Sequence, residues 1–295
     1  MPGNMYLSLR RWRYGGPRRS PPKKSPLARQ PRRRVVLLVH GYNVSEPAAR
    51  SSFEGFERNL NRIWPSLVQD CCWVLWPGDA VVPGASAMSY WRKVRTSRRC
   101  AGDLATYLDE LRDPDGLRPQ IAIVAHSLGC RLVLEALGSL HDSGEQTGDM
   151  DVVVILMAAA VPITMLGDAG MLQRSLSLAR SHVLYSRWDS TLANWFPIGQ
   201  RAALEWRYPL EAVGLRGRPF GRNVWQFRRE LTFHDHSDYW ESEIAAALVA
   251  RWLGGPVAPA SPTRSAIPPR EHFWREHAEW RSTPEYRELP ARKAA

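Results

Sequence analysis

The sequence has few cysteines and no long hydrophobic segment. Its four cysteines show neither Cys-x-x-Cys spacing nor neighbouring histidines, which argues against a zinc site or a disulfide scaffold and favours reduced thiols. The longest apolar run, Val152–Val161, is about half of the ~20 residues that a membrane helix needs. No apolar stretch of the kind found in secretory signals follows the N-terminal arginines. We therefore expect a cytoplasmic protein without a transmembrane segment.

Acidic residues are absent from one part of the chain. Residues 1–34 hold 11 of the 40 Lys and Arg residues and no Asp or Glu, whereas the other 261 residues hold 29 basic and 29 acidic groups. The net charge of +11 is therefore no sign of a nucleic-acid-binding fold. Because this segment is rich in proline and poor in apolar residues, we predict a mostly disordered tail over residues 1–34. Residues 5–14 alone could form an edge strand. The tail could make a weak contact with a polyanion or an anionic membrane.

Apolar runs alternate with helical patterns over residues 35–254. Continuous apolarity is typical of parallel strands that are covered on both faces, and the alternation predicts an α/β fold with helices on both faces of a mostly parallel sheet. The helical patterns span residues 90–112, 128–140 and 241–253. Residues 255–295 read as a Pro-rich linker and a C-terminal tail that could hold a short helix. The strand candidates are Val35–Val39, Cys72–Trp76, Ile121–Ala125, Val152–Met157, His182–Tyr185 and Asn223–Phe227.

The segment Ile121–Gly129 carries the strongest local signal. An apolar strand leads into Ala-His-Ser-Leu-Gly and then into a helical pattern, which is the G-x-S-x-G nucleophile elbow with Ala125 in place of the first glycine. A serine on such a tight turn needs small residues two positions before and after it. The turn predicts Ser127 as a nucleophile whose oxyanion could accept a hydrogen bond from the N–H of Leu128. The alternative is a serine that only caps a helix.

The strand Val35–Val39 ends in His40-Gly41-Tyr42-Asn43. The loop after an early central strand supplies the second oxyanion donor in this architecture, and Gly41 allows close approach of the backbone. We take the N–H of Tyr42 as the first choice for this donor and that of Asn43 as the second. For His40 we favour a structural role.

A serine nucleophile requires a base and an acid that orients it, which follow it in the order acid, then histidine. Asp189 comes just after the strand candidate His182–Tyr185, at the sheet edge where catalytic groups gather, and Asp168 is its rival. His236 and His234 both precede the last helix. We prefer His236 because Ser237 and Asp238 can begin that helix directly after it.

With these residues, the chain resembles the α/β-hydrolase superfamily, and in particular a largely uncharacterised bacterial group. The resemblance covers about residues 35–254 and rests on HGYN, WPGD, AHSLG, YSRWD and HSDYW. It implies Ser127 as nucleophile, Asp189 as acid and His236 as base. The basic segment before HGYN also implies that one or both early antiparallel edge strands are missing or reduced.

These observations predict a carboxylesterase-like or lipase-like serine hydrolase that cleaves a small-molecule ester through an acyl-enzyme, with no metal or organic cofactor. Two alternatives use the same triad: a lipase or phospholipase at a membrane surface, and an acyltransferase. An alternative of another class is a non-catalytic interaction protein that binds a polyanion through its basic tail.

Overall fold

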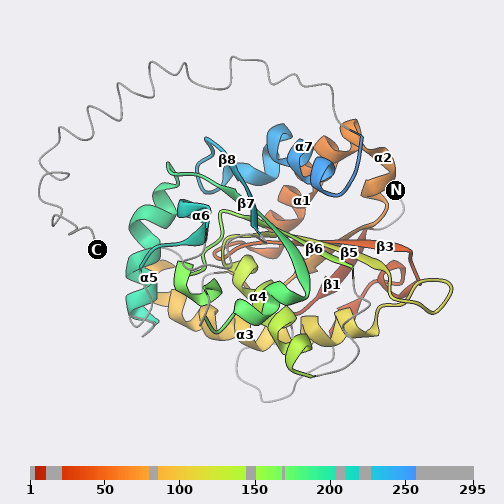
Figure 1. Cartoon of the computed structure of the whole chain (residues 1–295), viewed down its shortest axis with the longest axis horizontal. Helices are drawn as coiled ribbons and strands as arrows, with labels where there is room; N and C mark the ends of the chain where they lie inside the picture. Colours follow the sequence, from red (N-terminus) through yellow and green to blue (C-terminus); the bar gives the residue numbers. More distant parts are fainter. Residues whose placement is uncertain are drawn as a thin grey trace, which may run out of the picture. The chain divides into compact units, whose positions relative to one another are not determined.

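The apolar runs of the sequence form an eight-stranded sheet in the order β2-β1-β4-β3-β5-β6-β7-β8 (Figure 1). β1 and β2 pair antiparallel, whereas every other neighbouring pair is parallel. This arrangement confirms the predicted α/β fold class. The strands are β1 (Met5–Ser8), β2 (Lys23–Lys24), β3 (Arg34–Val39), β4 (Cys71–Leu75), β5 (Gln120–His126), β6 (Val152–Met157), β7 (Ala179–Tyr185) and β8 (Phe227–Leu231).

This computed structural model describes residues 4–10, 22–79, 86–143, 151–167, 170–203, 210–218 and 227–256. The chain divides into two units, Met1–Val257 and Ala258–Ala295, and every described residue belongs to the first. The predicted C-terminal linker and tail therefore lie almost wholly outside the described residues. In the part of the chain that is described, no helix is long and apolar enough to cross a membrane.

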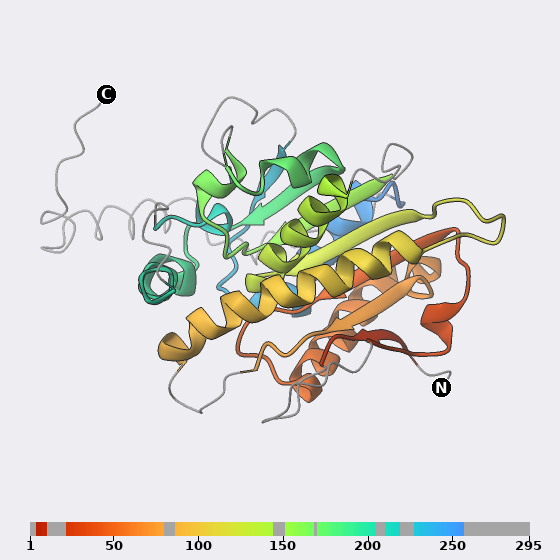
Figure 2. The ribbon, with the colours of Figure 1, turned by 90° about the horizontal axis from the view of Figure 1, so that it is seen from below.

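Helices cover both faces of the sheet. α1 and α7 pack together on one face, and α3 and α4 pack together on the other (Figures 1 and 2). α1 begins at a Ser45 side chain that accepts a hydrogen bond from the N–H of Ala48, and its buried residues include Phe53, Phe56 and Leu60. The helices are α1 (Glu46–Ile63), α2 (Pro65–Val68), α3 (Ser86–Glu110), α4 (Leu128–Asp142), α5 (Phe196–Ala202), α6 (Val213–Arg216) and α7 (Glu243–Trp252), with a π-helix at Thr191–Trp195.

The central strands are buried along almost their whole length. All six residues of β6 and all five of β4 are buried, as are the last five residues of β3. Strands of this kind have no solvent-facing side, which explains why the sequence shows continuous apolar runs and no alternation. The helices lie on two faces because right-handed crossovers join parallel strands.

The N-terminal segment differs from our expectation where it is described. β1 pairs in parallel with β4 and buries Met5 and Leu7, Leu9 follows it as a buried residue, and Ala28 is also buried. These residues belong to the folded sheet, so the expected disorder does not hold for them. The apolar side chains recur at every second position, which builds one apolar strand face, and the average composition of the segment conceals this pattern. The expected loss of edge strands is limited to a short β2 of two residues.

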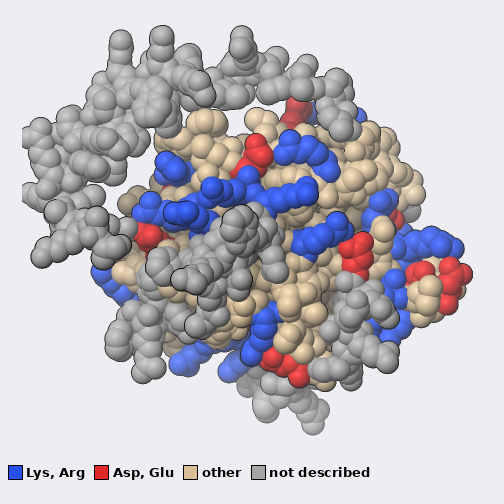
Figure 3. Space-filling model, in the orientation of Figure 1, with Lys and Arg blue, Asp and Glu red and all other residues tan. Residues whose placement is uncertain are grey.

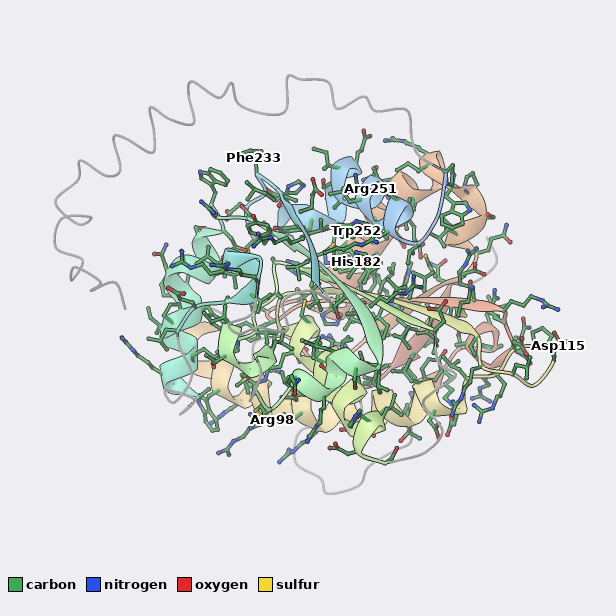
Figure 4. All side chains as sticks on the ribbon, viewed as in Figure 1. Arg98, Asp115, His182, Phe233, Arg251 and Trp252 are labelled. Atoms are coloured by element: carbon green, nitrogen blue, oxygen red, sulfur yellow. The ribbon has the colours of Figure 1, made fainter. Side chains whose placement is uncertain are left out.

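Many basic residues of the same segment have acidic partners. Each pair joins the segment to a loop or helix of the body, and Figure 3 shows basic and acidic side chains together at the edge where Figure 4 labels Asp115. The pairs neutralise part of the charge on which the expected polyanion contact depended. They are Arg10–Asp79 (2.9 Å), Lys24–Glu110, Arg32–Asp70 (3.9 Å), Arg33–Asp115 (3.0 Å) and Arg34–Asp70 (2.8 Å).

The last strand and helix also refine the sequence analysis. The sequence predicted a strand at Asn223–Phe227, but the strand β8 spans Phe227–Leu231, and residues 223–226 lie outside the described part. On α7, the ring of Trp252 stacks on His182 of β7 with centroids 4.6 Å apart (Figure 4). Burial, together with the charge of Arg228, lowers the pKa of His182 to about 4. This neutral ring helps to dock α7 on the sheet.

Candidate active site

Ser127 lies on a tight turn between β5 and α4. Its backbone has φ 53° and ψ −123°, a left-handed conformation that is strained for any residue with a side chain. The flanking backbone holds it there, because Ser127 N–H donates to the carbonyl of Met157 (3.0 Å) and the Ser127 carbonyl accepts from Ala160 N–H (3.2 Å). The predicted elbow therefore exists as a strained turn that is fixed by the neighbouring strand β6.

Small residues around Ser127 allow its turn to pack against the end of β3. A Cβ atom on Gly129 would lie 2.4 Å from the carbonyl oxygen of His40, and one on Gly41 would lie 2.8 Å from the Cβ of Ser127. Neither distance is tolerated by real side chains, so both positions require glycine. Ala125 is fully buried, consistent with the need for a small residue at the start of the motif.

The structure brings Ser127, His236 and Asp189 together in one hydrogen-bonded line. His236 Nε2 lies 2.8 Å from Ser127 Oγ, and His236 Nδ1 lies 2.8 Å from Asp189 Oδ2. Because the ionised carboxylate can only accept, Nδ1 carries the ring proton and Nε2 is free to accept the serine proton. These side chains come from the ends of β5, β7 and β8, which meet at one edge of the sheet.

Asp189 is fully buried and both of its oxygens are used. Oδ1 accepts a hydrogen bond from the N–H of Leu192 (2.8 Å), and Oδ2 faces His236. The adjacent loops are also joined, because Ser190 donates to Asp235 through its N–H and its hydroxyl. The rival acid, Asp168, lies outside the described residues.

His234, the rival base, has a different position. Its Nε2 pairs with the Ser242 hydroxyl, which caps α7, and its ring packs on Tyr239. Burial lowers its pKa. His234 thus supports the start of the last helix, while His236, two residues later, points toward Ser127.

The oxyanion donors can be compared directly. Leu128 begins α4, and the first N–H groups of a helix have no acceptor within that helix. Asn43 N–H donates to the carbonyl of Gly78 (2.8 Å), so the second choice is already engaged. Tyr42 lines the cavity beside Ser127, and its N–H stays our first choice for the second donor.

The loop that follows β4, residues 76–79, packs against the segment that carries Tyr42. His40 donates from Nδ1 to the Gly41 carbonyl (2.9 Å) and accepts at Nε2 from the N–H of Trp76 (3.3 Å). Burial lowers the pKa of His40 to about 4, so it stays neutral and structural, as we expected. Arg10, just after β1, ties Asp79 of the same loop to the N-terminal segment.

His126 is a site residue that the sequence analysis did not single out. Its Nε2–H donates to the backbone carbonyl of His236 (2.7 Å), and the two rings lie 4.9 Å apart. Burial, with a smaller contribution from His236, lowers the pKa of His126 to about 3. A neutral His126 therefore holds the backbone of His236, the predicted base. The only sequence signal was a polar residue beside the nucleophile in an otherwise apolar strand.

A cavity of about 390 Å³ opens beside Ser127 and His236. Within the described part of the chain, no cluster of three or more His, Cys, Asp or Glu side chains could hold a metal ion. All four cysteines are buried, with no disulfide between them. The chemistry available at this site is that of a serine, a histidine and a carboxylate next to backbone donors.

Comparisons with known proteins agree with this architecture. The family DUF900, described as "Alpha/beta hydrolase of unknown function", matches residues 23–201. No curated protein matches the sequence.

Several solved structures are similar at a distance. TT1662 from Thermus thermophilus is 13% identical with a TM-score of 0.41, over 78% of this chain and 90% of that one. Aspergillus fumigatus lipase B is 12% identical with a TM-score of 0.42, over 82% and 59%. The Pyrobaculum calidifontis esterase is 15% identical with a TM-score of 0.37, over 76% of each chain. All three TM-scores are below 0.5.

Proposed function

This chain belongs to the DUF900 family of α/β hydrolases, and we propose that it is a serine hydrolase that cleaves a small-molecule ester through Ser127, His236 and Asp189. One observation carries the proposal: the continuous hydrogen-bonded line from Ser127 Oγ through the His236 ring to Asp189. A serine becomes a nucleophile when a neighbouring base takes its proton, and the base needs an acid that fixes its tautomer.

In the first half of the reaction, His236 Nε2 takes the proton of Ser127 as Oγ attacks the ester carbonyl. The N–H groups of Tyr42 and Leu128 donate to the oxyanion that forms. His236 then returns the proton to the departing alkoxide, which leaves as an alcohol, and the acyl group remains on Ser127. Asp189 stays ionised and stabilises the imidazolium at each stage.

In the second half, a water molecule takes the place of the alcohol. His236 accepts a proton from the water as it attacks the acyl carbonyl, and the second oxyanion uses the same two donors. Collapse releases the acid and returns the proton to Ser127. An alcohol in place of this water would give acyl transfer, so the acyltransferase alternative differs only in the acceptor.

The test is hydrolysis of p-nitrophenyl butyrate by the wild type and by Ser127→Ala. We expect kcat to fall by about 10⁶-fold in the variant, as for other triad nucleophiles. Ser139→Ala is the matched control, because Ser139 is an exposed residue of the same helix, α4, and its loss should leave kcat unchanged. Near wild-type activity in Ser127→Ala would exclude the proposal. A parallel assay with added alcohol, in which ester and acid products are both measured, separates hydrolysis from acyl transfer.

A further inference from the structure

The cavity beside Ser127 has an apolar and largely aromatic wall. At about 390 Å³ it lies at the small end of ligand cavities, which span roughly 300–1,000 Å³. None of the described residues that line it is Lys, Arg, Asp or Glu. The apolar wall consists mainly of Tyr42, Val44, Tyr90, Leu192, Trp195 and Phe196.

The chemistry of this wall selects against charged substrates. A carboxylate or an ammonium group would lose its hydration in the cavity and find no opposite charge there, which is strongly unfavourable. An alkyl chain, by contrast, gains free energy with each methylene that it buries. Trp195 lines the cavity and is also 59% exposed, so it marks the mouth through which a chain would enter.

We propose that this cavity binds the short to medium acyl chain of a neutral ester, because its volume lies at the small end of ligand cavities. This inference rests on the proposed serine hydrolase function. The acyl side is assigned because the acyl group stays bonded to Ser127 through both halves of the reaction, whereas the alcohol leaves after the first. A cavity that adjoins the nucleophile can therefore hold the acyl group throughout.

Tyr90 and Gly199 both line this cavity and pack against each other, so we infer that this pair limits the chain length that the cavity accepts. The start of α3 lies beside α5 (Figures 1 and 2), and a Cβ on Gly199 would lie 2.7 Å from Cδ1 of Tyr90. On another side, the Tyr90 ring meets Tyr42 edge-on, with centroids 5.6 Å apart. The ring is thus held between the α5 backbone and the loop that carries the oxyanion donor.

Gly199 has no other evident reason to be glycine. Glycine in a helix interior is less favourable than alanine, and here the missing side chain makes room for the ring of Tyr90. A methyl group at this position would displace the ring, and both residues line the cavity. Gly199→Ala should therefore shorten the cavity, and Tyr90→Ala should lengthen it.

The test is a series of p-nitrophenyl esters from acetyl to palmitoyl, measured as kcat/KM. For the wild type we expect a rise of about fourfold per added methylene until the cavity is full, and a fall for dodecanoyl and palmitoyl esters. Gly199→Ala should lower the ratio of hexanoyl to acetyl activity by about tenfold, and Tyr90→Ala should move the optimum to longer chains. A glutarate monoester, with a negative charge on its acyl chain, should react at least 100-fold more slowly than the pentanoyl ester.

Gly102→Ala is the matched control, because Gly102 is an exposed glycine of α3 whose added Cβ would meet nothing within 4 Å. Its chain-length profile should match the wild type. If Gly199→Ala acts by displacing the Tyr90 ring, it should no longer lower the hexanoyl-to-acetyl ratio in a protein that already carries Tyr90→Ala.

Two failures can be told apart. If no ester in the series is hydrolysed, or Ser127→Ala remains active, the serine hydrolase proposal is wrong. If esters are hydrolysed but the acyl profile is flat, or is unchanged by both Gly199→Ala and Tyr90→Ala, the acyl-cavity proposal is wrong.

Discussion

Ser127, the proposed nucleophile, and its two proposed partners are held in place by different kinds of contact. Ser127 is fixed by backbone hydrogen bonds to the β6 segment and by glycines that let the chain pass close to β3. Asp189 and His236 lie on loops, and side-chain hydrogen bonds to Leu192, Ser127 and each other hold them. This difference predicts that damage to the packing of the elbow will lower stability as well as activity, whereas loss of a partner on the loop side will lower activity alone.

Replacement of the base should give the largest effect on the loop side. His236→Ala removes the group that takes and returns the serine proton, so kcat should fall by about 10⁶-fold while the thermal midpoint changes little. His234→Ala, the matched control, should retain activity, because His234 contacts Ser242 of the last helix. Ester hydrolysis and a melting curve are measured for each variant. If His234→Ala is inactive, the assignment of His236 as the base is wrong.

Asp189→Asn should come next. An amide at this position can donate to His236 Nδ1 and so favour the wrong ring tautomer, which costs about 10⁴-fold in kcat in a related triad. The loss should be smaller than that of His236→Ala, since the acid moves no proton. Steady-state kinetics at saturating ester measure it, and equal losses in the two variants would contradict the division of roles.

His126→Phe probes a contact on the boundary between the two sides. The ring packing remains, but the hydrogen bond to the His236 carbonyl is lost, and we expect kcat to fall by about tenfold with little change in KM. His126→Gln restores a donor and should recover part of that loss. If both variants have wild-type kcat at every pH, His126 has no positioning role.

On the elbow side, Gly129→Ala should damage stability together with activity. Its added Cβ would lie 2.4 Å from the His40 carbonyl oxygen, and overpacking of this kind costs about 1–3 kcal/mol. Gly102→Ala again serves as the control, with no loss. The free energy of unfolding, measured in urea, distinguishes the two variants. A Gly129→Ala protein with full stability but low activity would contradict the view that this glycine is needed for the packing of the elbow.

Stability should also depend on pH, because two buried histidines stay neutral in the folded protein. His40 and His126, with pKa values near 4 and 3, bind protons in the unfolded chain near pH 6.5 but not in the folded protein. Their contribution to stability is therefore complete above about pH 6.5 and is lost as the pH falls toward 3. We expect the melting temperature to fall by roughly 5–10 °C between pH 7 and pH 5, and to fall less in His126→Phe. If the melting temperatures of the wild type and His126→Phe fall equally between pH 7 and pH 5, His126 does not contribute to this pH dependence.

The same contrast explains how much the sequence could predict. The elbow depends on small residues at fixed spacing within one segment, so Ala125, Ser127 and Gly129 were recognisable. The alternation of strands and helices likewise predicted the parallel sheet. Asp189 and His236 could be predicted as the acid and the base because the order of strands places their loops at one edge, and the structure brings both within hydrogen-bond distance of each other.

What the sequence could not show depends on contacts between distant segments. The role of His126 depends on a carbonyl 110 residues away, and the folding of β1 depends on an open edge at β4. Acidic partners scattered through the body offset five basic side chains of the N-terminal segment, whereas the local composition suggested an unpaired tail. Tertiary context decided each of these features.

Covalent labelling by a fluorophosphonate, followed by intact mass and peptide mapping, tests the central claim most directly. Only a serine activated by a neighbouring base reacts readily with such a probe. We predict one label per chain, located on Ser127, with no labelling of Ser127→Ala and much slower labelling of His236→Ala. A label on a different residue, or equal labelling rates in the wild type and His236→Ala, would contradict a nucleophile at Ser127 activated by His236.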